Sequence, residues 1–115
     1  MYSVTEQFVA WLAAQGYRAA TYPPADETVF VTVERTGGGV EDMVDHPALA
    51  IQAWATTEPR AEEMCNEVRV ALLTSALPVG VMHVEIESGP YRFYDDETMA
   101  PRYQLTVNAT SILTD

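Results

Sequence analysis

The chain has 115 residues, a length that fits one domain with a single hydrophobic core. Its 48% hydrophobic and 20% charged content is typical of soluble globular proteins. Seventeen acidic residues against six basic ones give a net charge of −11, so phosphate backbones repel the chain, which argues against clamping or reading nucleic acid. The charge either keeps a small domain soluble or lines a channel through which DNA slides.

The sequence also indicates where the protein is made. A single cysteine, Cys65, cannot form an internal disulfide. No basic and then apolar N-terminal segment suggests a signal peptide, and no apolar run approaches the roughly 20 residues of a spanning helix. We therefore expect synthesis in a reducing cytoplasm and no membrane contact.

The N-terminal residues predict a helix. Ser3 and Glu6 have the spacing of a capping box, and Phe8, Trp11 and Leu12 follow at helical intervals. Gly16 is a natural stop because glycine adopts the left-handed conformation that helix ends require. We expect Phe8 and Trp11 to anchor this helix in the core.

Three extended segments follow. Residues 17–22 predict a short strand that ends at Pro23 and Pro24. Residues 28–36 and 47–55 alternate in side-chain character, as expected of an antiparallel sheet with one covered and one partly wet face. The simplest arrangement of these two segments is a long hairpin.

Residues 37–46 are predicted to form a ten-residue loop at the tip of that hairpin. Gly37, Gly38 and Gly39 give the backbone freedom, and three apolar side chains follow with no evident core to enter. These are Val40, Met43 and Val44. Long loops with exposed apolar groups are usually functional, so this segment is a candidate contact surface.

The second predicted helix is the clearest element. Thr57 is suited to the N-cap, and Pro59 fits the first turn. A core-facing stripe follows, formed by Ala61, Met64, Cys65, Val68, Ala71 and Leu72. Val70 and Leu73 lie off this stripe, so they either widen the buried face or contact another subunit.

Three late extended segments, 81–87, 91–94 and 102–112, read as a strand meander. The expected fold is therefore α+β, a single domain with a mainly antiparallel sheet flanked by two helices. The expected element order is α-β-β-β-α-β-β-β.

No residue pattern indicates an enzyme or a cofactor site. Glu41, Asp42, Asp45 and His46 could hold a divalent ion, but their spacing matches no known metal loop. The acidic run 95–97 likewise reads as a solvated loop. Neither histidines nor serines have partners placed for nucleophilic catalysis. We expect no catalytic residues, no metal and no cofactor.

Four arginines have two possible roles. Arg35, Arg69, Arg92 and Arg102 could meet the carboxylates of a partner protein, or could form ordinary ion pairs within the chain.

The succession of segments resembles the tail-terminator (tail-completion) proteins of bacteriophages with long noncontractile tails. The resemblance covers nearly the whole chain, and its motifs are loose. They are the Arg-Thr-Gly-Gly turn at 35–38, the Asp-x-Pro step at 45–47 and the apolar strand that ends with Trp54.

This resemblance implies a structural, non-enzymatic virion protein. Such proteins form a six-membered ring that caps the tail tube, ends its polymerisation and joins the tail to the head. The implied partners are further copies of the chain, the tail tube protein and a head-side connector protein, with DNA only as passing cargo. The implied location is the virion tail, assembled in the cytoplasm of the host bacterium. The residues expected to contact a subunit or the tube are Arg35, Gly37, Gly38, Gly39, Val40, Met43, Val44, Arg69, Val70 and Leu73.

Two alternatives remain open from the residues. One is another head-tail joining or head-closure protein of similar size and acidity. The other is a domain that binds a small ligand between sheet and helices. The aromatic candidates for that pocket are Trp54, Tyr91, Phe93 and Tyr103, with Gln52 as the polar group.

Overall fold

The computed structural model describes residues 2–93 and 99–112 of the chain. The elements are α1 (Val4–Ala14), β1 (Ala19–Ala20), β2 (Phe30–Glu41), β3 (Val44–Trp54), α2 (Glu58–Thr74), β4 (Val81–Arg92) and β5 (Arg102–Ile112). This confirms the α+β class, with two helices and a mostly antiparallel sheet around one core.

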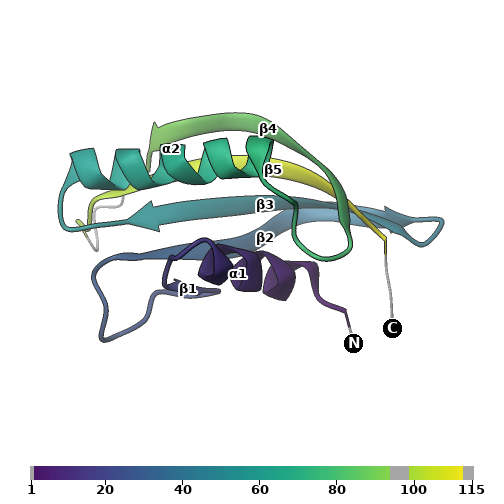
Figure 1. The fold of residues 1–115 in the computed structure, drawn as a ribbon, viewed down its shortest axis with the longest axis horizontal. Helices are drawn as coiled ribbons and strands as arrows, with labels where there is room; N and C mark the ends of the chain where they lie inside the picture. Colours follow the sequence, from purple (N-terminus) through teal and green to yellow (C-terminus); the bar gives the residue numbers. More distant parts are fainter. Residues whose placement is uncertain (1, 94–98, 113–115) are drawn as a thin grey trace.

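The five strands form one sheet in the order β1-β2-β3-β5-β4. β1 pairs with β2 in parallel, and every other neighbouring pair is antiparallel. Both helices pack on the same face of the sheet, α1 beside β1 and β2 and α2 across β3, β5 and β4 (Figure 1). The opposite face has no helix in the described part of the chain and is called the open face below.

Both helices begin where the sequence predicts. Ser3 Oγ accepts a hydrogen bond from the Glu6 N–H, and Thr57 Oγ1 accepts one from the Arg60 N–H. Gly16, with φ +100°, follows the first helix. Trp11 Nε1 donates to the Ala76 carbonyl at 2.7 Å, which ties α1 to the segment after α2.

The core lies between the helices and the sheet. Alternate strand residues supply it, among them Val31, Val33, Leu49, Ile51, Leu105 and Val107. The predicted stripe of α2 covers them, with Ala71 only partly buried. Val29 precedes β2 and is 41% exposed.

The predicted ten-residue loop at 37–46 is wrong. β2 continues to Glu41 and β3 begins at Val44, so paired strands replace the loop. The register runs from Phe30 opposite Trp54 to Glu41 opposite Val44, with a bulge between Arg35 and Gly37. The glycines were interpreted as loop formers, but here they lie within a bulged strand.

The predicted separate strand at 91–94 is also wrong, which changes the element order to α-β-β-β-α-β-β. β4 runs without a break from Val81 to Arg92, and Tyr94 lies outside the described residues. β4 bulges around Gly89 and remains paired with β5. Gly89 has φ +108°, and a Cβ there would lie 2.4 Å from the Gln104 carbonyl oxygen, so this position requires glycine.

None of the helices in residues 2–93 and 99–112 is both long enough and apolar enough to cross a membrane.

Candidate functional site

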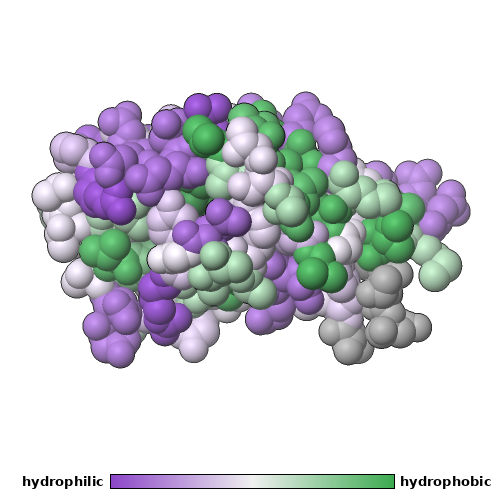
Figure 2. All heavy atoms as spheres, in the orientation of Figure 1, coloured by the Kyte–Doolittle hydropathy of each residue, from purple (hydrophilic) through white to green (hydrophobic). Residues whose placement is uncertain are grey.

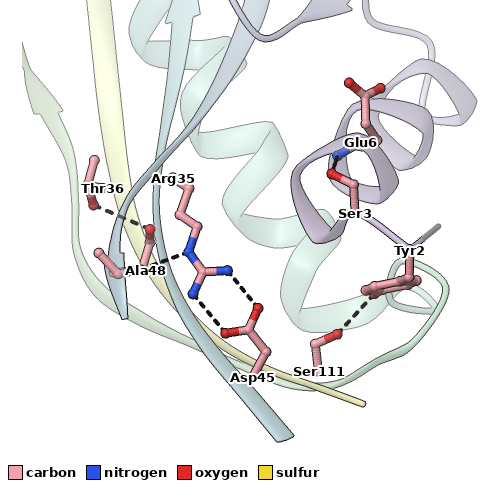
Figure 3. A network of polar contacts seen from close by, with 9 residues as sticks. Tyr2, Ser3, Glu6, Arg35, Thr36, Asp45, Ala48 and Ser111 are labelled. Atoms are coloured by element: carbon pink, nitrogen blue, oxygen red, sulfur yellow. Dashed lines mark hydrogen bonds and ion pairs between the residues drawn. The ribbon is translucent and has the colours of Figure 1, made fainter. Parts of the chain in front are cut away.

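The base of the β2–β3 hairpin is fixed by an ion pair. The Arg35 guanidinium donates two hydrogen bonds to the Asp45 carboxylate, at 2.6 and 2.7 Å, and a third to the Gly37 carbonyl at 3.2 Å (Figure 3). Asp45 is only 3% exposed. These hydrogen bonds hold the pKa of Asp45 below its ordinary value and raise the pKa of Arg35. Arg35 is therefore occupied within its own chain.

The glycine segment brings the two strands close together. Gly38 has φ +93°, and a Cβ there would lie 2.0 Å from the His46 carbonyl oxygen. Only glycine fits this backbone without a shift of the neighbouring strand. Gly39 has no atom within 4 Å of its Cβ position, and Gly37 meets only the Ala48 side chain at 4.0 Å.

The hairpin tip, residues 40–44, presents apolar groups to solvent. Asp42 and Met43 form the two-residue turn, with φ of 51° and 66°. Met43 is 73% exposed and Val40 58% exposed, whereas Val44 is half-buried and pairs with Glu41 and Ile112. The sequence therefore identified the apolar groups of this surface, although it predicted the wrong backbone for them.

The hairpin is braced by neighbouring elements. β5 pairs with β3 as far as Val44, opposite Ile112. Ser111, adjacent on β5, donates through Oγ to the Tyr2 hydroxyl at 3.0 Å (Figure 3). That hydroxyl donates in turn to the Val79 carbonyl at 2.7 Å. The tip thus extends from a supported, three-stranded base.

Three residues of the predicted contact set, Arg69, Val70 and Leu73, lie on the surface of α2, far from the hairpin in the sequence. Val70 is 43% and Leu73 57% exposed. Arg69 Nε donates to Asn66 Oδ1 at 3.0 Å, one turn away. Hydrophobic side chains gather toward the end of the molecule that carries the hairpin in the view of Figure 2.

The remaining arginines of the predicted set also bond within the chain. Arg92 lies 2.6 Å from Glu58 at the start of α2. The guanidinium of Arg102 stacks on Trp54 at 4.2 Å and on Phe93 at 4.5 Å from the ring centroids. The intrachain role predicted as one of two possibilities therefore accounts for these side chains.

The open face carries a polar network that the sequence did not predict. Gln52 Nε2 donates to Gln104 Oε1 at 2.7 Å, and Gln104 Nε2 donates to the Tyr91 hydroxyl. Strand alternation was the available signal, because Gln52 and Gln104 both fall on the face opposite the core. Their pairing depends on the β3–β5 register, which a single sequence does not reveal.

The predicted pocket between sheet and helices is wrong. Trp54 and Tyr91 belong to the open face, where Arg102 and Gln104 contact them, whereas Tyr103 packs against the core. Gln52 is likewise on the open face rather than among the core residues. Strand alternation separates the proposed lining residues onto two sides of one sheet.

An apolar groove lies instead at the end of the sheet farthest from the hairpin tip. The proline groove, about 380 Å³ in volume, is lined chiefly by Pro23, Pro24, Thr28, Phe30, Trp54 and Pro101. The Phe30 and Trp54 rings stack with centroids 5.2 Å apart, and Trp54 Nε1 donates to Thr32 Oγ1 at 3.1 Å. The three prolines come from two distant segments, so their meeting depends on the fold.

The acidic residues weighed as metal ligands are not assembled into a site in the described residues. Asp45 is bound to Arg35, and no cluster of three or more His, Cys, Asp or Glu side chains could hold a metal there. The acidic run 95–97 lies outside the described residues.

A search of this sequence against protein-family models found no matching family, and a search of curated proteins found no significant match.

Proposed function

We propose that this protein is a structural, non-enzymatic component of a bacteriophage tail, acting as a tail terminator. It forms a six-membered ring on the end of the tail tube, ends tube polymerisation and provides the surface to which the head-side connector binds. It is assembled in the cytoplasm of the host bacterium. The sequence resemblance supplies the family, and the surface of the fold supports an assembly role.

The observation that carries the proposal is the braced hairpin with an apolar tip. Val40 and Met43 are more than half exposed on a chain of net charge −11. Isolated surface apolar residues are common, but these are presented on a projecting turn whose base is fixed by the Arg35–Asp45 pair. A fixed apolar projection is suited to contact with a neighbouring protein.

The backbone of the turn adds to this argument. Two-residue hairpin turns with positive φ at both positions favour asparagine, aspartate and glycine. Asp42 fits that preference, whereas Met43 at φ 66° does not. A long apolar side chain at a strained position is consistent with selection for contact rather than for folding.

The charge supports the role of DNA as passing cargo. With seventeen acidic and six basic residues, the ring has no excess of cations with which to hold phosphate groups. Acidic side chains around the central hole would repel DNA and allow it to slide.

Light scattering across a concentration series, at low and moderate salt, tests the assembly. We expect a discrete species near six subunits. Met43→Asp should lower its population at least about tenfold, because a buried unpaired carboxylate costs more than the about 1.4 kcal/mol that one decade requires. Met82→Asp on β4 is the matched control, since Met82 is also an exposed methionine, 53% exposed. A strict monomer at every concentration, with or without tail tubes, would contradict the proposal.

A further inference from the structure

The hairpin tip and the proline groove lie at opposite ends of the same pair of strands. The tip joins Glu41 to Val44, and the groove includes Phe30 and Trp54, the pair at the other end of the β2–β3 register. These strands run along the long axis of the molecule, which extends 42 Å (Figure 1). The two features therefore point away from each other and cannot meet within one chain.

We propose that the hairpin tip of one copy inserts Met43 into the proline groove of the next copy. This inference rests on the proposed self-assembly and specifies the subunit contact that would produce it.

The side chains match in chemistry. Methionine is unbranched and flexible, and its sulfur makes favourable contacts with aromatic rings. The groove supplies Phe30 and Trp54 together with the rigid faces of Pro23, Pro24 and Pro101. Insertion would remove the most exposed apolar group of the tip from water.

The groove also has a cation beside it that can face the acidic tip. In the described part of the chain, Glu41 and Asp42 at the tip have no cation within ion-pair distance. Arg18 lies beside the groove, where it is 3.7 Å from Glu27, one of the lining residues. Both side chains of that pair are substantially exposed, at 52% and 41%, so the pair is weak. Arg18 also donates to the Ala19 carbonyl at 3.2 Å, which leaves guanidinium N–H groups for a carboxylate of a neighbouring tip, while Glu27 offsets part of the positive charge.

The contact is heterologous, because two different surfaces of the same chain meet. Heterologous contacts propagate head to tail and close into a ring when the rotation between copies permits. The tip-to-groove contact therefore belongs to the class of contact that a ring requires.

Disulfide trapping between two singly substituted proteins tests the contact. One preparation carries Met43→Cys at the tip and the other carries Thr28→Cys, an exposed residue of the groove. The native Cys65 is buried, which raises its pKa to about 12 and keeps it unreactive. The matched control pairs Met82→Cys with Thr28→Cys. Mass measurement of the unoxidised mixtures reports assembly independently.

We expect the Met43–Thr28 pair to form a cross-linked heterodimer about tenfold faster than the control pair, because docking raises the effective concentration of the thiols. Self-association without preferential cross-linking would overturn this inference and leave the proposed ring intact. A monomeric mixture without cross-linking, with or without tail tubes, would overturn both. Binding of a small apolar ligand in the groove of such a monomer would assign the groove to that ligand instead.

Discussion

The Arg35–Asp45 pair gives a residue predicted to contact a neighbouring protein a structural role within its own chain. The sequence singled out Arg35 as a contact residue, but its guanidinium binds Asp45 in its own hairpin through two hydrogen bonds. Its contribution to assembly would therefore be indirect, through the geometry of the hairpin base. Removing it would leave the Asp45 carboxylate buried, at 3% exposure, without its partner.

Replacing Arg35 with alanine should destabilise the fold by about 2–3 kcal/mol, because a buried carboxylate loses its charge-assisted hydrogen bonds. Arg69→Ala is the control, since Arg69 makes a single hydrogen bond to Asn66 on the helix surface. We expect that change to cost less than about 0.5 kcal/mol. Urea unfolding monitored by circular dichroism measures both, and equal losses would contradict the assigned role of the pair.

The same pair predicts a pH dependence of stability. Arg35 lowers the pKa of Asp45 in the folded state below its ordinary value of 3.8. The ionised Asp45 therefore contributes stability above that value, and the contribution disappears as pH falls through the folded-state pKa.

Asp45→Asn should accordingly be less stable than the wild type by a constant margin from about pH 7 to pH 5. The margin should shrink progressively below about pH 4, because the wild-type carboxylate becomes protonated. Urea unfolding of both proteins between pH 2 and 7 measures the difference, and a margin that grows on acidification would contradict it.

At the scale of elements, the hairpin depends on one glycine more than on its neighbours. Gly38→Ala should destabilise the fold by about 2 kcal/mol or more, because its φ of +93° is strained for alanine and the new Cβ would meet the His46 carbonyl oxygen. Gly39→Ala is the matched control, with open space at its Cβ position. Comparable midpoints of urea unfolding for the two variants would refute the close approach of the strands at Gly38.

Met43→Gly should stabilise the monomer and weaken self-association. Glycine accepts the positive φ of this turn position, so the monomer should gain about 0.5 kcal/mol. Self-association should weaken at the same time, because the apolar side chain is gone. Thermal unfolding at low concentration and light scattering at high concentration measure the two effects. Unchanged association would show that Met43 takes no part in the contact.

The elements that the sequence predicted well are those with local signals. Ser3 and Thr57 cap helices through bonds to residues three positions ahead, and the stripe of α2 repeats at helical intervals. The elements predicted wrongly depend on partners far along the chain. Glycines 37–39 remain in a strand because β3 pairs with them, and Gly89 is held in β4 by pairing with β5.

The candidate site likewise has one part with a local sequence signal, the hairpin tip, and one part without such a signal, the proline groove. Exposed apolar residues at 40 and 43 stand out in the sequence because they interrupt a polar, glycine-rich segment. The proline groove does not, because Pro23, Phe30 and Pro101 meet only after the sheet has formed. No local pattern predicts a groove assembled from the β1–β2 connection, two strand ends and the approach to β5.

At the scale of the whole molecule, the tip and groove give the chain two different ends, and this polarity makes a prediction about mixtures. A copy with a defective tip still has a groove, and a copy with a defective groove still has a tip. Met43→Asp provides the first. Thr28→Glu provides the second, because it adds a carboxylate beside the groove on an exposed position where Glu41 and Asp42 of a neighbour would approach.

Each variant alone should be monomeric at concentrations where the wild type assembles. An equimolar mixture should give a heterodimer and nothing larger, because only one productive junction can form between the intact tip and the intact groove. Analytical ultracentrifugation resolves monomer, dimer and ring. If the contact were instead a two-fold one between identical surfaces, such as tip against tip, the variant that keeps that surface intact would dimerise on its own. A dimer that appears only in the mixture, together with a species larger than a dimer for the wild type, would therefore establish head-to-tail polarity.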